Sequence, residues 1–246
     1  MNSRSTSSLP PAREATATER VYAGIHAAVV ERRLAPGEWL REEELAANFG
    51  VSRTVVRQAL QRLAQHQVLE LIHNRGARVP VPALEDAAHV FEARRVAECE
   101  IARRLGGRLS AEQLAALQAL AEREAAASAQ GDHAGAVRLS AEFHRELARL
   151  HGNPVLLRLL ESLLPSTSVL MARFVAEGQA VCVAHRHVDL VAALGRGSAA
   201  AAAEMKQHLA ELERSLTQAE APPQRPLRDV FGAYRERRET REPDAA

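Results

Sequence analysis

The chain has few aromatic residues, few cysteines and almost no net charge. Only 3% of its 246 residues are aromatic, and 32 basic and 31 acidic side chains leave a formal net charge of +1. So few aromatic residues within a 46% hydrophobic composition favour helices over sheets. Two cysteines, Cys99 and Cys182, both in apolar helical stretches, argue against a disulfide framework and indicate a reducing compartment.

The sequence also lacks the marks of a membrane or secreted protein. We find no apolar run of the length that a membrane span needs, and the polar N-terminus has no leader-like core. We therefore expect a cytoplasmic protein without a membrane partner. Residues 1–17, rich in Ser, Thr, Pro and Ala, are expected to be disordered.

Basic charge is concentrated in one stretch. Residues 51–79 contain five arginines and a single acidic residue, whereas residues 31–50 are net acidic. A neutral chain with one concentrated basic segment is a better candidate for nucleic-acid binding than its overall charge suggests.

The order of the predicted elements defines two domains. Residues 18–81 are expected to hold three helices and a β-hairpin around Asn74–Gly76, the order of a winged helix-turn-helix. Pro80 and Pro82 mark a linker. Residues 84–217 are then expected to form an all-α antiparallel bundle, so the fold class is mainly α. Its six helices are predicted at 84–105, 110–130, 132–150, 154–175, 179–194 and 198–216. Residues 218–246 are expected to be a polar tail with at most one short helix, around 229–237.

The third predicted helix carries the side chains suited to reading DNA. In a helix-turn-helix the second helix of the motif enters the major groove and presents its first residues to base edges. Arg53 and Arg57 are four residues apart, so they share one helix face, and arginine pairs bidentately with guanine. Thr54 can contact phosphate or a thymine methyl group, and the polar hairpin tip can contact an adjacent phosphate or the minor groove. The plainer alternative is a solvated basic helix face.

At this point the residues resemble a known family. The run LAPGEWLREEELAANFGVSRTVVRQALQRLAQHQVLELIHNRGARV is similar to the GntR family of bacterial regulators. The resemblance implies DNA contacts from the second helix of the motif and from the wing tip, at Ser52, Arg53, Thr54, Arg57, Asn74, Arg75 and Gly76. The sequence departs from the usual pattern at Val55, where proline is common, and at Glu43, where several members carry a basic residue.

The second half of the chain is similar to the helical ligand-binding domain of the FadR-type branch. The matching stretches are FEARRVAECEIARRL, EFHRELARLHGNP, HVDLVAAL and MKQHLAELE. Many members hold a divalent metal with three histidines and one carboxylate, and small carboxylates bind that metal. By motif the histidines are His144, His187 and His208, and imidazole suits zinc or nickel. Ser140 stands where the fourth, carboxylate ligand is usual.

The sequence leaves three interpretations of these histidines open: a metal site completed by water or by the effector, a metal-free anion pocket, or ordinary packing. Arg94, in the family's Arg-x-x-x-Glu arrangement with Glu98, could clamp an effector carboxylate. Its alternative is a surface ion pair with Glu98. The predicted effector site therefore comprises Arg94, Ser140, His144, His187 and His208.

The sequence thus predicts a homodimeric repressor that binds double-stranded operator DNA and responds to a small organic acid. It is not expected to be an enzyme, since no catalytic constellation accompanies the histidines. Two alternative functions remain open at this point: a metal-dependent enzyme that uses the three histidines, and a ligand-independent architectural DNA-binding protein.

Overall fold

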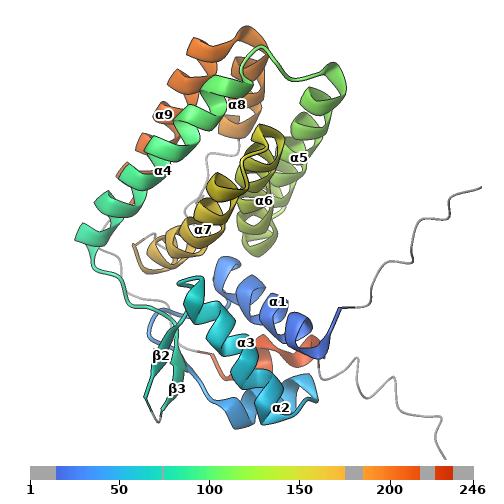
Figure 1. The fold of residues 1–246 in the computed structure, drawn as a ribbon, viewed down its shortest axis with the longest axis vertical. Coiled ribbons are helices and arrows are strands. Elements are labelled where there is room, and N and C mark those ends of the chain that lie inside the picture. The colour runs from blue at the N-terminus through green and yellow to red at the C-terminus, as the bar shows by residue number, and fades with distance from the viewer. Residues whose placement is uncertain (1–14, 74, 175–184, 217–224, 235–246) are drawn as a thin grey trace, which may run out of the picture.

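The computed structural model describes residues 15–73, 75–174, 185–216 and 225–234, which form two packed parts (Figure 1). The smaller part holds α1, α2, α3 and a small sheet. The larger part holds α4 to α9. The mainly helical class predicted from the sequence is confirmed, as is the order of a winged helix-turn-helix followed by a helical domain.

The smaller part is the winged helix-turn-helix. Its helices are α1 (Ala17–Val30), α2 (Glu42–Phe49) and α3 (Arg53–Gln65), and its strands are β1 (Trp39–Leu40), β2 (Glu70–Ile72) and β3 (Gly76–Arg78). The strands form one antiparallel sheet in the order β1-β3-β2. The sequence predicted only the β2-β3 hairpin, because the two residues of β1 are too few to show an alternating pattern.

Helix α3 separates a buried face from an exposed one. Val56, Leu60 and Leu63 lie at helical spacing and are at most 1% exposed. Ser52 is the N-cap, and its side chain accepts a hydrogen bond from the backbone N–H of Val55. Arg53 therefore begins the helix on the side turned away from the core.

Glycine is required at the start of β3. Gly76 has a φ of +94°, a conformation that L side chains rarely adopt. A Cβ atom there would lie 3.0 Å from the carbonyl oxygen of Leu40 in β1. Because Gly76 pairs with Ile72 of β2 and lies against Leu40 of β1, a substitution at this position would disturb both the wing and the sheet.

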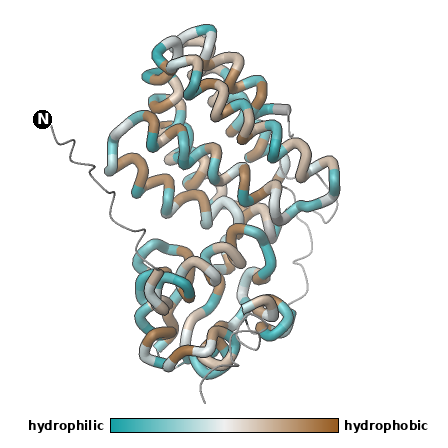
Figure 2. The backbone as a smooth tube through the Cα atoms, turned by 90° about the vertical axis from the view of Figure 1, so that its right-hand side faces the viewer, coloured by the Kyte–Doolittle hydropathy of each residue, from teal (hydrophilic) through white to brown (hydrophobic). Residues whose placement is uncertain are grey.

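The larger part is a bundle of six described helices: α4 (Leu84–Leu105), α5 (Ala111–Ala129), α6 (His133–His151), α7 (Pro154–Phe174), α8 (His185–Arg196) and α9 (Ser198–Arg214). Apolar and polar positions alternate along these helices, as Figure 2 shows, and their apolar faces form one core. The sequence predicted the helix before α9 to start at residue 179, but residues 179–184 lie outside the described part of the chain.

One bundle helix is more apolar than the sequence reading anticipated. Residues 154–171 of α7 are long and apolar enough, by length and composition, to cross a membrane. The same test is passed by core helices of soluble proteins, and α7 contacts α4, α6 and α1. We therefore assign α7 to the core of the bundle.

Helices α4 and α9 approach closely at one end of the bundle. A Cβ atom on Gly106 would lie 2.6 Å from the backbone of Gly197, so only glycine allows this approach. The side chain of Ser198 donates a hydrogen bond to the carbonyl of Gly106 at 3.2 Å. These contacts fix α4 against α9, the helices that carry Arg94 and His208.

The C-terminal segment returns to the DNA-binding part. The short helix α10 (Leu227–Val230), red in Figure 1, lies beside α2. Phe231 is fully buried in the core of the winged helix-turn-helix and its ring centroid lies 5.1 Å from that of Phe49. Arg33 donates a hydrogen bond to the carbonyl of Val230 at 2.8 Å. This stretch of the expected polar tail is thus an integral part of the N-terminal core.

Candidate functional site

The surface expected to bind DNA is an open groove lined by α3, the start of α2 and the wing. Arg53 and Arg57 both line it, and acidic side chains of α2 pair with them. Arg57 donates two hydrogen bonds to Glu42, from Nε at 2.9 Å and from Nη2 at 2.7 Å. Arg53 donates one to Glu43 at 2.9 Å. DNA must therefore displace or share these acidic partners before it engages the arginines.

The other predicted DNA contacts lie around the same groove. Thr54 and Arg75 are exposed, and Arg75 and Gly76 line the groove from the wing. The side chain of Ser52 accepts the capping hydrogen bond of α3, which leaves its hydroxyl hydrogen available to an acceptor. Asn74 lies outside the described residues.

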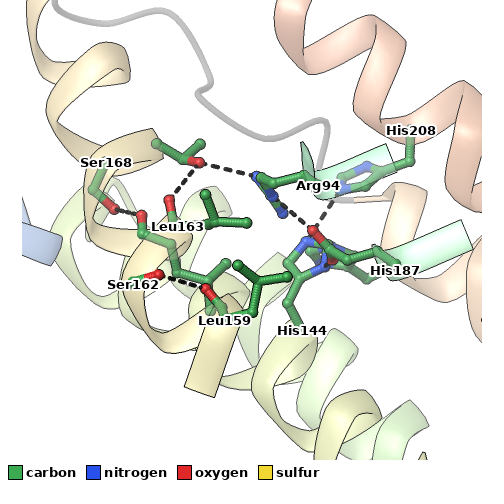
Figure 3. Close-up of polar contacts among 11 residues, drawn as sticks. Arg94, His144, Leu159, Ser162, Leu163, Ser168, His187 and His208 are labelled. Atoms are coloured by element: carbon green, nitrogen blue, oxygen red, sulfur yellow. Dashed lines mark hydrogen bonds and ion pairs between the residues drawn. The ribbon is translucent and has the colours of Figure 1, made fainter. Parts of the chain in front are cut away.

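Three histidines from three helices converge inside the bundle (Figure 3). They are His144 of α6, His187 of α8 and His208 of α9. The Nε2 atom of His144 lies 3.2 Å from Nε2 of His187 and 3.3 Å from Nε2 of His208. Each side chain is at most 3% exposed. One nitrogen of each imidazole therefore faces a common point.

Two buried carboxylates fix the orientation of these rings. Glu98 of α4 contacts Nδ1 of His144, and Glu124 of α5 contacts Nδ1 of His187. A carboxylate at Nδ1 places the proton there and leaves the lone pair of Nε2 directed to the centre. The ring of Phe143 stacks on His187 with centroids 4.3 Å apart, which holds that ring further.

The electrostatics of the site favour neutral imidazoles at His144 and His208. Burial lowers the pKa of His144, with Glu98 opposing the shift. Burial and then the neighbouring imidazoles lower the pKa of His208 well below 6.5. Although its own burial acts the other way, Arg94 and His144 lower the pKa of Glu98 to about 2. At neutral pH His144 and His208 thus offer unprotonated nitrogens beside the ionised carboxylate of Glu98.

Arg94 is buried, at 1% exposure, and lies next to the histidines (Figure 3). It donates from Nε to Glu98 at 2.6 Å and from Nη1 to Thr167 of α7 at 3.4 Å. The alternative of a surface ion pair is therefore wrong in its location: the pair with Glu98 exists, but in the interior. Nη2 of Arg94 has no hydrogen-bond partner among the described residues.

A cavity opens beside the cluster. Its walls include Arg94, Glu124, Ser140 and His144, with apolar contributions from Leu164 and other residues of α6, α7 and α9. Ser140 is one helical turn before His144 and so shares its face. All five residues predicted for the effector site thus lie in the cavity wall or in the adjoining histidine cluster.

Sequence reasoning missed the two carboxylates that orient the histidines. Glu98 was considered only as a partner of Arg94, and Glu124 was not considered. The signal for Glu124 was present, because it continues the buried stripe of Leu117 and Ala121 at helical spacing on α5. A carboxylate on an apolar stripe needs a buried partner.

The residues present fit a divalent transition metal. Three imidazole nitrogens lie within 4.8 Å of one another, and imidazole suits zinc and nickel. Three protein ligands leave at least one coordination position for water or a ligand. The carboxylates on two of the Nδ1 atoms are the outer partners that metal-binding histidines usually have.

Comparisons with known proteins agree with both halves of the fold. Residues 17–79 match the sequence model of the bacterial regulatory proteins of the gntR family, and residues 89–211 match that of the FCD domain. The HTH-type transcriptional repressor RspR of Escherichia coli (strain K12) is 25% identical over 202 residues, which are 81% of this chain and 89% of that protein. The Nta operon transcriptional regulator of Aminobacter aminovorans is 31% identical over 142 residues, 57% of this chain and 65% of that protein.

Solved structures share the architecture. A transcriptional regulator GntR from Rhodococcus sp. RHA1 has a TM-score of 0.69 at 25% identity, over 89% of this chain and 99% of that one. E. coli McbR/YncC has a TM-score of 0.67 at 20% identity, with the same coverage, and supports the fold alone. The relatives are regulators of transcription, which confirms the prediction that the protein is not an enzyme.

Proposed function

Because this chain belongs to the GntR family of bacterial regulatory proteins and its helical half is an FCD domain, we propose that it is a repressor controlled by a small carboxylate. Its role as a transcriptional regulator follows from the family. The sign of regulation, the effector class and the metal are the proposed parts.

The arginine groove supports specific operator binding. Arg53 and Arg57 lie at the start of α3, where base edges are read, and each can form two hydrogen bonds to guanine. Their bonds to Glu43 and Glu42 hold the guanidinium groups in the groove before DNA arrives. Arg75 of the wing lines the same groove and would contact the phosphate backbone of the DNA beside the site read by α3.

The single observation that carries the effector proposal is the buried cluster of three Nε2 atoms beside Arg94. In the proposed site His144, His187 and His208 hold a divalent metal, zinc or nickel. The metal would supply a Lewis-acidic position for a carboxylate oxygen. Arg94 would bind the same carboxylate through Nη2, since charge-assisted bonds to arginine are the strong ones. Glu98 keeps Arg94 and His144 in place.

The proposed oligomer is a homodimer in the cytoplasm. A two-fold dimer presents one α3 to each half-site, with the half-sites about 34 Å apart or a multiple of that. Val96 of α4 and Val155 of α7 are apolar side chains exposed to 73% and 60%, and either could contribute to a contact between protomers. A palindromic operator is expected in consequence.

The experiment that tests the proposed function begins with natively purified protein. Elemental analysis is expected to find about one zinc or nickel per chain, and mass spectrometry of the denatured sample is expected to release a small organic acid. Adding that acid back to stripped protein should weaken binding to operator DNA selected from genomic fragments. Metal-free protein with no bound acid, or operator binding that no acid affects, would contradict the proposal.

A further inference from the structure

Two buried polar atoms in the wall of the cavity lack a hydrogen-bond partner within the described part of the chain: Nη2 of Arg94 and Oε1 of Glu124. Both side chains are 1% exposed, and both line the same cavity. Leaving a buried donor or acceptor unpaired costs about 1–3 kcal/mol, and native proteins contain few such atoms. A donor and an acceptor that face one cavity indicate a ligand with an acceptor and a donor of its own.

We propose that Glu124 selects an effector that carries a hydrogen-bond donor, a hydroxyl or ammonium group, next to its carboxylate. This inference rests on the proposed function, in which Arg94 binds the carboxylate. It adds that a plain aliphatic acid is a poor ligand, and that Glu124 is the residue that rejects it.

The contacts of Glu124 restrict where its side chain can turn. Its Oε2 atom contacts Nδ1 of His187, and its helix face continues the buried stripe of Leu117 and Ala121. The side chain therefore cannot turn to solvent without leaving His187 unpaired. Since Oε2 accepts from the Nδ1–H of His187, the free oxygen of the same carboxylate is also an acceptor, so the group opposite Oε1 has to be a donor.

The formal charges around the cavity predict whether the protein prefers a ligand with a hydroxyl group or one with an ammonium group. Arg94 contributes one positive charge, while Glu98 and Glu124 contribute one negative charge each, so the cluster is formally anionic when its imidazoles are neutral. A divalent metal makes it cationic, and a hydroxy acid, which is an anion, then restores neutrality. Without metal, a zwitterionic amino acid adds no further negative charge. We therefore expect metal-loaded protein to prefer the hydroxy acid and stripped protein to prefer the amino acid.

Three acids with one carbon skeleton test this preference: propionate, L-lactate and L-alanine, which differ only in the substituent at C2. Titration calorimetry would measure their binding to the full chain, zinc-loaded and EDTA-stripped. We expect lactate to bind zinc-loaded protein at least about tenfold more tightly than propionate, because propionate leaves Oε1 unpaired. We expect alanine to lead in stripped protein.

Two variants test whether Glu124 causes the preference for a ligand with a hydrogen-bond donor. In Glu124→Gln the one amide oxygen is needed by His187, so an NH₂ group faces the cavity. The ammonium group of alanine cannot accept a hydrogen bond from it, so in stripped protein the preference for alanine over propionate should fall to less than about threefold. Glu122→Gln changes an exposed residue of the same helix and should leave the preference unchanged. The unfolding temperature of each sample shows whether the variant is folded. The comparison of the three acids in wild-type protein does not depend on either variant.

The outcomes separate this inference from the proposed function. Equal binding of the three acids to wild-type protein, or a preference for alanine in stripped protein that survives Glu124→Gln, overturns the role of Glu124 and leaves the carboxylate effector standing. If none of the three acids binds wild-type protein in either state, the carboxylate effector and the role of Glu124 both fail.

Discussion

At the scale of single residues, the arginines of α3 carry the proposed specificity. Arg53 reaches the groove, and its ion-pair partners among the described residues are the exposed Glu43 and, at 3.8 Å, Glu42. Exposed ion pairs of this kind contribute little to stability, so Arg53 can leave them for a guanine. Glu43 lines the same groove and keeps a negative charge at the edge of the DNA surface.

Arg53→Ala is expected to weaken binding to the specific operator by about 1–3 kcal/mol and to relax base preference at one position. The measurement is fluorescence anisotropy with operator and with scrambled DNA. Arg104→Ala, which removes an exposed arginine from α4, is the matched control and should bind as wild type. Equal losses on both DNAs would show that Arg53 contacts phosphate rather than a base.

Ser140 lines the cavity at the position where we expected a carboxylate ligand from the resemblance to the family. Ser140→Asp is expected to tighten zinc binding, because the new carboxylate lies one turn before His144 and on the same face of α6. Ser162→Asp on α7, outside the cavity wall, is the control and should have no effect. In a metal-free anion pocket the added carboxylate would instead repel the effector. Zinc content that stays near zero, with a weaker response to the effector, would refute the metal site.

The lowered pKa of His26 predicts how the free energy of unfolding depends on pH. Burial, and then Arg145 and His66 nearby, lower the pKa of His26 from 6.5 to about 4. The folded state thus disfavours the protonated ring, whereas the unfolded chain takes up a proton near pH 6.5. The stabilisation is complete above about pH 6.5 and is lost as the pH falls toward 4.

We expect urea unfolding to give a free energy that is about 1–2 kcal/mol lower at about pH 5 than at about pH 7.5 because of this group. His26→Gln should remove that part of the difference. His73→Gln, at an exposed position of the wing, should retain it. An unchanged pH dependence in His26→Gln would mean that the protonated ring is accommodated in the fold.

At the scale of elements, the sequence predicted the long helices with a periodic apolar pattern. It missed the shortest strand and the contacts between residues that are distant in sequence. The helical periodicity predicted α4 to α7 with ends within a residue or so, because long amphipathic stretches show a strong pattern. The family motifs identified three histidines, His144, His187 and His208, that do converge in the structure although they lie on three helices. The two-residue β1 has no pattern to read. Phe231 was missed because its partner Phe49 is remote in sequence. Glu124 stands on a buried stripe that the sequence does show, but the stripe does not identify its distant partner His187.

The C-terminal helix α10 is predicted to stabilise the DNA-binding part. Phe231→Ala removes a fully buried ring that packs on Phe49, which costs about 3–5 kcal/mol at typical core positions. Hydrogen exchange should show lost protection in α1 and α2 with the bundle unaffected. Leu159→Ala, at an exposed position of α7, is the control. Unchanged protection in α1 and α2 would show that the segment merely lies on the surface.

At the scale of the whole molecule, the cavity and the DNA groove are joined by continuous contacts. Helix α6 carries Ser140 and His144, and it also contacts α1 of the DNA-binding part. Arg138 of α6 lies 3.8 Å from Glu31, which in turn pairs with Arg33. A shift of α6 on ligand binding would therefore reach the winged helix-turn-helix directly. Thermodynamic linkage requires the effect to be reciprocal, so operator DNA must also change the affinity for the ligand.

The central claim is that occupancy of the histidine pocket sets the affinity for operator DNA. The most direct measurement compares the operator Kd of stripped protein with that of protein loaded with zinc and the co-purified acid, in wild type and in His208→Ala. We predict a change of about 5- to 150-fold in wild type, the usual range of allosteric coupling, and almost none in the variant. The same Kd in both states of the wild-type protein would contradict the account.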